Sequence, residues 1–219
     1  MLHCPKYRHM YEGFQRKLTD LDFATYGKFR GKLAEFFTQM GYKPEKRASM
    51  YFGERRHIYL DEANHRIVDV FFDKLEFSHT LNLGGRLELD SPTITLSDIL
   101  FEKMQIAKIN EKDIKDTIIM LREHEVDANG KDVLDERYIA KLLSSDWGFY
   151  YTVTMNLQKV RDFLEHFPVL GEEDKKDVAA KVDRLVAAIE KEPKTMSWRA
   201  RARVGTRKKW YADVEEVVR

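Results

Sequence analysis

The chain has 219 residues, enough for one large domain or two small ones with a real hydrophobic core. The chain has 38 basic and 37 acidic residues, so it has almost no net charge. Its overall electrostatic potential therefore does not indicate nucleic acid or a membrane as partner. The single cysteine, Cys4, excludes an internal disulfide, and no long apolar run or signal-peptide pattern predicts a membrane span, so we expect a cytoplasmic protein.

The first 17 residues are expected to form a loop or a short helix, and they lead into an acidic stretch. Asp20 and Asp22 alternate there with Leu21 and Phe23, which predicts a strand. Side chains two apart in a strand point to the same face, so the two carboxylates emerge together while the apolar residues face a core. Arg16, just ahead, is expected either to meet a bound phosphate or to pair with one of these aspartates.

Residues 66 to 72 form a second predicted strand, in which Asp69 is the acid among apolar neighbours. An unpaired buried carboxylate is costly, so a partner for Asp69 is expected. Three carboxylates within about 4 Å of one another repel unless a cation lies among them. Mg²⁺ prefers oxygen ligands and keeps open positions for substrate phosphates. We therefore predict that Asp20, Asp22 and Asp69 hold a divalent metal for phosphoryl or nucleotidyl transfer.

The rest of the first half predicts a mixed sheet flanked by helices, an α+β fold. A core helix is predicted from Thr25 to Met40, ending at Gly41 and carrying an apolar stripe. Its stripe consists of Tyr26, Phe29, Leu33, Phe36, Phe37 and Met40. The predicted strands are 47–53, 56–60 and 66–72, with a hairpin from 77–83 to 86–89 through Gly84 and Gly85. We interpret Arg55, Arg56 and His57 as surface residues, with substrate contact as the alternative.

Two further helices carry charged residues of interest. Lys103 lies within the apolar stripe of a helix predicted from Thr95 to Ile109, so it either extends to the rim or reaches a polar pocket shared with the sheet. In the next helix, which runs from the expected cap Asn110 to about His124, Asp113 is the third helical residue, where a carboxylate is favoured by capping and by the helix dipole. Asp116 is placed for an ordinary pair with Lys112.

These residues carry a resemblance to a known superfamily. The Asp-x-Asp strand, followed by an apolar strand with one aspartate, resembles the DNA polymerase beta-like nucleotidyltransferases. Lys103 and the run from Asn110 to Asp116 resemble the lysine and the (Arg/Lys)-Asp-x-x-Asp pattern of the AbiEii-type abortive-infection toxins and their uncharacterised bacterial relatives. The resemblance implies transfer of a nucleoside monophosphate from a nucleoside triphosphate to an acceptor hydroxyl.

The resemblance also implies roles and partners. Asp20, Asp22 and Asp69 would be catalytic and hold Mg²⁺ or Mn²⁺, while Lys103 would bind the triphosphate with help from Asp113. The acceptor would be tRNA or another RNA, and a cognate antitoxin would be a further partner. The superfamily places a Gly-Ser or Gly-Gly pair before the Asp-x-Asp, a motif this chain lacks. Either the chain begins downstream of that motif, or the fold survives as a catalytically silent nucleotide-binding or RNA-binding module.

We assign residues 1–125 to a nucleotidyltransferase-like core and 126–219 to a helical subdomain, with the boundary at the loop containing Asn129 and Gly130. Amphipathic helices are predicted at 135–144, 147–167 and 172–192. The final segment is basic and interleaved with aromatic residues, a composition that suits RNA phosphates and bases. Its candidate RNA-binding residues are Trp198, Arg199, Arg201 and Arg203, and the alternative is a solvated tail that pairs with Glu215 and Glu216.

Overall fold

The computed structural model describes residues 3–17, 20–46, 51–130 and 132–214. The predicted α+β class is confirmed, with about half of the chain helical and 15% in strands. The described chain divides into two compact units. The helical unit takes in the described residues of Met1–Arg16, Phe77–His79 and Leu96–Val214, and the sheet unit takes in those of Lys17–Glu76 and Thr80–Thr95.

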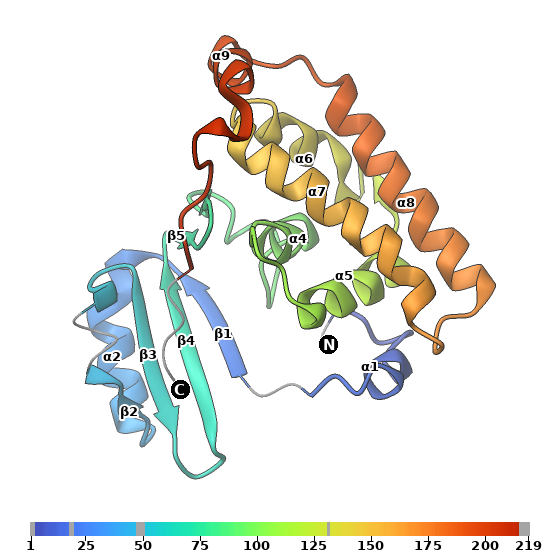
Figure 1. The fold of residues 1–219 in the computed structure, drawn as a ribbon. Helices are drawn as coiled ribbons and strands as arrows, with labels where there is room; N and C mark the ends of the chain where they lie inside the picture. The colour runs from blue at the N-terminus through green and yellow to red at the C-terminus, as the bar shows by residue number, and fades with distance from the viewer. Residues whose placement is uncertain (1–2, 18–19, 47–50, 131, 215–219) are drawn as a thin grey trace. The chain divides into compact units, whose positions relative to one another are not determined.

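The sheet unit is built on a four-stranded mixed sheet with the strand order β1-β4-β3-β2 (Figure 1). The strands are β1 (Asp20–Thr25), β2 (Lys43–Pro44), β3 (Arg56–Asp61) and β4 (Arg66–Phe72). β1 runs parallel to β4, and β3 runs antiparallel to both β4 and β2. The alternating and apolar patterns of residues 20–23, 56–60 and 66–72 therefore predicted strands correctly.

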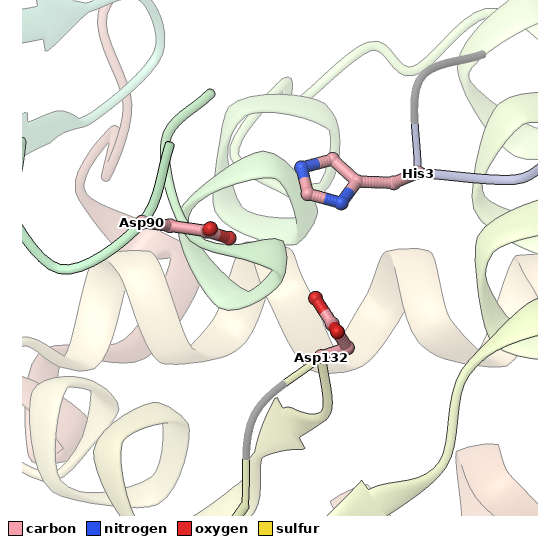
Figure 2. Close-up of side chains that lie close together, drawn as sticks. All are labelled: His3, Asp90 and Asp132. Carbon is pink, nitrogen blue, oxygen red and sulfur yellow. The ribbon is translucent and has the colours of Figure 1, made fainter. Parts of the chain in front are cut away.

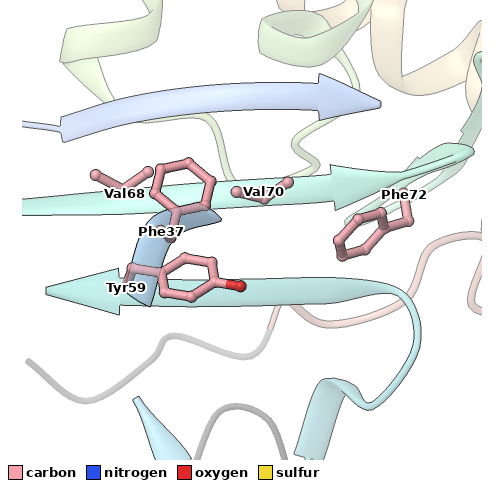
Figure 3. Close-up of a cluster of buried hydrophobic side chains, with 5 residues drawn as sticks. All are labelled: Phe37, Tyr59, Val68, Val70 and Phe72. Carbon is pink, nitrogen blue, oxygen red and sulfur yellow. The ribbon is translucent and has the colours of Figure 1, made fainter. Parts of the chain in front are cut away.

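One face of this sheet packs against α2 (Arg30–Gln39), which follows the short helix η1 (Gly27–Phe29). Figure 3 shows Phe37 lying over the two central strands, where its ring stacks on Tyr59 with the centroids 4.6 Å apart. Val68, Val70 and Phe72 complete this buried cluster. Because successive strand residues alternate in direction, the odd-numbered residues of β4 face away from α2.

The helix predicted from Thr25 to Met40 is shorter than expected, because Thr25 ends β1 and α2 begins at Arg30, and the predicted apolar stripe is only partly core. Phe36 and Met40 are 52% and 62% exposed, while Phe37 is 7% exposed. Leu21 and Phe23 point to the same side of the sheet, yet they are 39% and 48% exposed. These four residues line an open apolar groove of about 410 Å³ beside α2. The prediction that all of them are core residues was wrong, because they border this open groove instead of being enclosed.

The structure also corrects the hairpin predicted after residue 76. β5 (Lys74–Glu76) pairs with β6 (Thr80–Asn82), so the chain reverses at residues 77–79 instead of at Gly84 and Gly85. Residues 86–89 form consecutive turns. The strand predicted at 47–53 lies outside the described residues at 47–50, and residues 51 and 52 are helical.

In the helical unit, α7 packs against five other helices (Figure 1). The helices of this unit are α1 (His9–Gly13), α4 (Leu96–Met104), α5 (Glu111–Glu123), α6 (Glu136–Leu143), α7 (Trp147–Phe163), α8 (Glu172–Lys191) and α9 (Met196–Val204). Helices are thus present where α4 to α8 were predicted, but α4 ends at Met104 instead of Ile109, and the predicted helix 147–167 consists of α7 followed by the short helix η2 (Leu164–His166). Residues 96–125, placed by the sequence with the nucleotidyltransferase-like core, pack with the later helices, and β7 (Val126–Asp127) pairs with β8 (Leu134–Asp135) at the expected boundary.

A part-buried hydrogen bond joins the C-terminal segment to α7. The indole Nε1 of Trp210 donates to Thr152 Oγ1 at 3.1 Å, and the same hydroxyl lies 2.8 Å from His79 Nε2. The imidazole of His79 stacks on Phe149, with 5.0 Å between the ring centroids. Thr152 therefore joins the end of the chain to a histidine from its middle.

We expect His79 to make the protein less stable in mild acid. Burial lowers the pKa of His79 to about 4 from 6.5, because the charged imidazolium loses its hydration inside the helical unit. As pH falls, His79 is protonated in the unfolded chain before it is protonated in the folded protein. The free energy of unfolding is therefore unaffected above pH 6.5 and falls below it, by about 2 kcal/mol at pH 5. Urea unfolding at pH 7 and pH 5 measures this loss.

The control for this prediction is the exposed His166. His79→Gln should reduce the difference in unfolding free energy between the two pH values, whereas His166→Gln should leave it as in the wild type. An unchanged difference in His79→Gln would assign the acid sensitivity to other groups.

Candidate functional site

The three aspartates predicted to act together share one face of the sheet. Asp69 on β4 lies beside Asp22 in the parallel register with β1, and register partners point to the same face. Asp20 joins them because it is two residues from Asp22. Asp22 is exposed, Asp20 is half-buried, and Asp69 is 3% exposed. This acidic face, defined by Asp20, Asp22 and Asp69, is opposite the face that packs against α2.

Asp69 has the partner that its burial demands, and that partner is Arg56 of β3. Nε of Arg56 donates to Oδ1 of Asp69 at 3.0 Å, and Nη2 donates to Oδ2 at 2.8 Å. The guanidinium also lies 5.2 Å from the ring centre of Phe52 and 5.0 Å from that of Phe71. With 15% and 4% of their side chains exposed, Arg56 and Asp69 form a bidentate, nearly buried ion pair.

The acidic face fits a divalent ion in part. Asp20 and Asp22 supply hard oxygen ligands at an edge strand, which suits an ion that keeps several waters. Both oxygens of Asp69, however, already accept hydrogen bonds from Arg56. Within the described part of the chain, these three carboxylates do not belong to a group whose ligand atoms all lie within 4.8 Å of one another. The described geometry therefore does not bring the three predicted ligands together around one ion, and Asp69 is held by a guanidinium.

A second set of possible ligand side chains is drawn in Figure 2, namely His3, Asp90 and Asp132. His3 and Asp132 belong to the helical unit, where the imidazole of His124 lies 2.7 Å from the carbonyl of His3 and 3.1 Å from that of Asp132. Asp90 belongs to the sheet unit. Because these ligands are divided between the units, we assign no metal to them.

Lys103 lies in a cluster of carboxylates within the helical unit. Its Nζ is 3.1 Å from Glu102, 3.6 Å from Asp113 and 3.9 Å from Asp116, and 20% of its side chain is exposed. Burial by itself lowers the pKa of Lys103, but the three carboxylates outweigh burial and hold that pKa above its usual range. Burial also raises the pKa of Asp113, against the opposing effect of Lys103. Lys103 therefore lies in a polar environment, but its partners belong to the helical unit and not to the pocket shared with the sheet that the sequence predicted.

Arg16 pairs with Asp116, a partner that the sequence analysis did not name. Nε and Nη2 of Arg16 each donate to a different carboxylate oxygen of Asp116 at 2.9 Å. Asp116 thus interacts with Arg16 and Lys103 instead of the predicted Lys112. The predicted cap is present, since the backbone N–H of Asp113 donates to the side chain of Asn110 at 3.0 Å.

The candidate RNA-binding residues of α9 divide into two kinds. Arg201 lies over the ring of Trp147 at 4.7 Å and donates to the carbonyls of Gly205 and Lys208 at 2.7 and 2.8 Å. Trp198 packs edge-on against Tyr150, with 5.0 Å between the ring centroids. Arg199 and Arg203 are exposed. Within this set, only these last two can reach a phosphate without giving up an internal contact.

Arg56 is the residue of the acidic face that sequence reasoning missed, since it was interpreted as a surface residue. Two signals could have found it. Asp69 needed a cation, and Arg56 shares the alternation of Ile58 and Leu60 on the neighbouring predicted strand. Antiparallel pairing sets Ile58 opposite Asp69, which places Arg56 diagonally within reach of it.

No family model, curated protein or solved structure matches this chain. A membrane-spanning helix would need both length and apolar character, and none of the helices in the described ranges combines the two.

Proposed function

We propose that the chain is a metal-dependent nucleotidyltransferase, which transfers a nucleoside monophosphate from a nucleoside triphosphate to an acceptor hydroxyl. The observation that supports this most directly is the strand register that sets Asp69 beside Asp22, with Asp20 on the same face. A rigid sheet is a suitable support for carboxylates that must hold an ion in a fixed geometry. RNA as acceptor and an antitoxin as partner remain predictions from the resemblance.

In this proposal the aspartates have different roles. Asp20 and Asp22 would hold Mg²⁺ or Mn²⁺, and the bound ion would neutralise the charge of the triphosphate. Asp69, when released by Arg56, would orient the acceptor hydroxyl and accept its proton. The roles of Lys103 and Asp113 towards the triphosphate remain predictions, because the structure shows these two paired with each other in the helical unit.

Labelled nucleotide transfer tests the proposal. The protein is incubated with Mg²⁺, total RNA and each of the α-labelled ribonucleoside triphosphates, and label in RNA is measured. Asp22→Asn is expected to lower the rate by at least about 100-fold, because it removes a charged ligand of the ion. Glu35→Gln is the matched control, since Glu35 is an exposed acid on α2, which packs on the opposite face. The proposal fails if no triphosphate labels RNA, or if Asp22→Asn transfers label as fast as the wild type.

The bidentate pair between Arg56 and Asp69 favours a second candidate function, a catalytically silent nucleotide-binding module. A silent module would still bind Mg²⁺ with a triphosphate through Asp20 and Asp22, and this ligand would raise the melting temperature. A thermal shift that depends on Asp22, without transfer of label to any RNA, would support the silent module over the enzyme.

A further inference from the structure

The segment that follows α8 concentrates positive charge. Between Glu192 and Asp213 the sequence contains lysines and arginines but no acidic residue. Because the whole chain has a formal net charge of +1, the rest of the chain is net negative. The excess of positive charge therefore lies in α9 and in the turn that follows it. A basic segment on a chain with almost no net charge is a local attraction for a polyanion.

Some of these cations fold the segment without losing their charge. Arg201 donates to the carbonyls of Gly205 and Lys208 at 2.7 and 2.8 Å. Arg207 donates to the carbonyl of Arg203 at 2.6 Å. A carbonyl oxygen satisfies an N–H group, but it carries no formal charge and so does not neutralise the guanidinium. The segment is therefore held together by its own backbone and keeps its positive potential.

Two arginines form the outer face of α9. Trp198 and Arg201 pack against α7, whereas Arg199 and Arg203 are exposed. These two are four residues apart, so they lie one above the other on the same face of the helix. Across the residues that the structure describes, neither forms an ion pair with a carboxylate. Like charges at this spacing destabilise a helix, and a bound anion would remove that repulsion.

The aromatic residues of the segment are engaged within the protein. Trp198, Trp210 and Tyr211 are all half-buried, and the indole nitrogen of Trp198 is buried. Trp210 packs edge-on against both Tyr151 and Tyr211, with 5.0 and 5.1 Å between the ring centroids. Proteins that hold single strands stack the bases on available aromatic rings. With its rings packed internally, this segment suits phosphates, and it suits a duplex, whose bases are already stacked.

We propose that the outer face of α9, defined by Arg199, Arg203 and the exposed Lys208 that follows, binds the phosphate backbone of a double-stranded nucleic acid without reading its sequence. The proposal goes beyond nucleotide transfer, because it is carried by the helical unit and does not involve the acidic face. Binding of this kind releases counterions from the duplex, so it weakens steeply as salt is added.

Fluorescence anisotropy with labelled duplexes tests this proposal. An RNA duplex and a DNA duplex of the same mixed sequence are titrated with the whole protein at several salt concentrations. Arg199→Gln/Arg203→Gln is expected to weaken binding at least about 10-fold at low salt. The slope of log K against log salt should fall by about 2, because each lost phosphate contact lowers it by about 1. A duplex of a second sequence should bind equally well.

Two double variants are the controls. Lys112→Gln/Lys176→Gln removes the same charge from exposed positions on α5 and α8, so it should leave the salt slope unchanged. Arg199→Lys/Arg203→Lys keeps both charges, and it should bind close to the wild type because a phosphate accepts a lysine as a point charge. Glutamine is a good helix former, and circular dichroism verifies that the variants fold.

The outcomes decide both the face and the ligand. The proposal is overturned if neither duplex binds, if Arg199→Gln/Arg203→Gln binds as tightly as the wild type, or if the Lys112 and Lys176 control weakens binding equally. Tighter binding to a single strand of the same sequence would indicate base stacking and overturn the choice of a duplex. Binding to phosphatidylserine vesicles but to neither duplex would assign the face to a membrane surface instead. Binding to either duplex supports the proposal, and the tighter one identifies the nucleic acid.

Discussion

Replacing Phe37 with alanine is expected to lower the free energy of unfolding of the sheet unit by about 3–5 kcal/mol. Phe37 is 7% exposed and stacks on Tyr59, and its ring lies against Val68 and Val70 at the centre of the cluster in Figure 3. Truncation removes this apolar surface and leaves a cavity that the rigid strands cannot fill. Urea unfolding followed by circular dichroism measures the loss.

The adjacent residue offers a matched control for this prediction. Phe36 has the same side chain on the same helix but is 52% exposed, so Phe36→Ala should cost less than about 1 kcal/mol. Equal losses in the two variants would mean that the packing of α2 on the sheet is not what stabilises this unit.

Replacing Lys103 with methionine is expected to lower the free energy of unfolding of the helical unit by about 3 kcal/mol. This is the low end for breaking a buried ion pair, because 20% of the Lys103 side chain remains exposed. Methionine keeps much of the apolar length but leaves Glu102, Asp113 and Asp116 to repel one another. The loss is measured by urea unfolding at pH 7.

The destabilisation of Lys103→Met should depend on pH with a definite sign. Burial already raises the pKa of Asp113, and loss of the lysine raises that pKa further. When folding raises the pKa of a carboxyl group, that group stabilises the folded state at a pH below its pKa in the unfolded chain. This stabilisation is lost as pH rises through its pKa in the folded protein. The variant should therefore be closer to the wild type at pH 4 than at pH 7. Lys112→Met, on the exposed side of α5, is the control and should change stability little at either pH.

Local patterns in the sequence were sufficient to predict the strands and helices that have a clear hydrophobic periodicity. Asp20 to Phe23 alternates polar and apolar residues, and Arg66 to Phe72 is apolar apart from Arg66 and Asp69, as a central strand should be. The same patterns placed Asp22 and Asp69 on strands. That the two aspartates share a face depends on the register of β1 against β4, which the separate patterns do not contain.

The errors arose where the outcome depends on residues far apart in the chain. Helical spacing marks Phe36 and Phe37 equally as apolar, but only Phe37 packs into the cluster on the sheet, where it stacks on Tyr59. Gly84 and Gly85 suit a tight turn, but the pairing of β5 with β6 puts the reversal earlier. The pair between Arg56 and Asp69 requires the relative register of two strands, which neither strand encodes alone.

The path of the backbone limits how this molecule can be divided. The chain passes from one unit to the other after Arg16, Glu76, His79 and Thr95, so each unit is assembled from separated stretches of sequence. Fragments cut near residue 126 would each lack parts of a hydrophobic core, since α4 and α5 pack with α7. A deletion that removes one of these stretches would therefore disrupt a folded unit as well as any site on it. Point substitutions are the appropriate way to assign functions to individual residues.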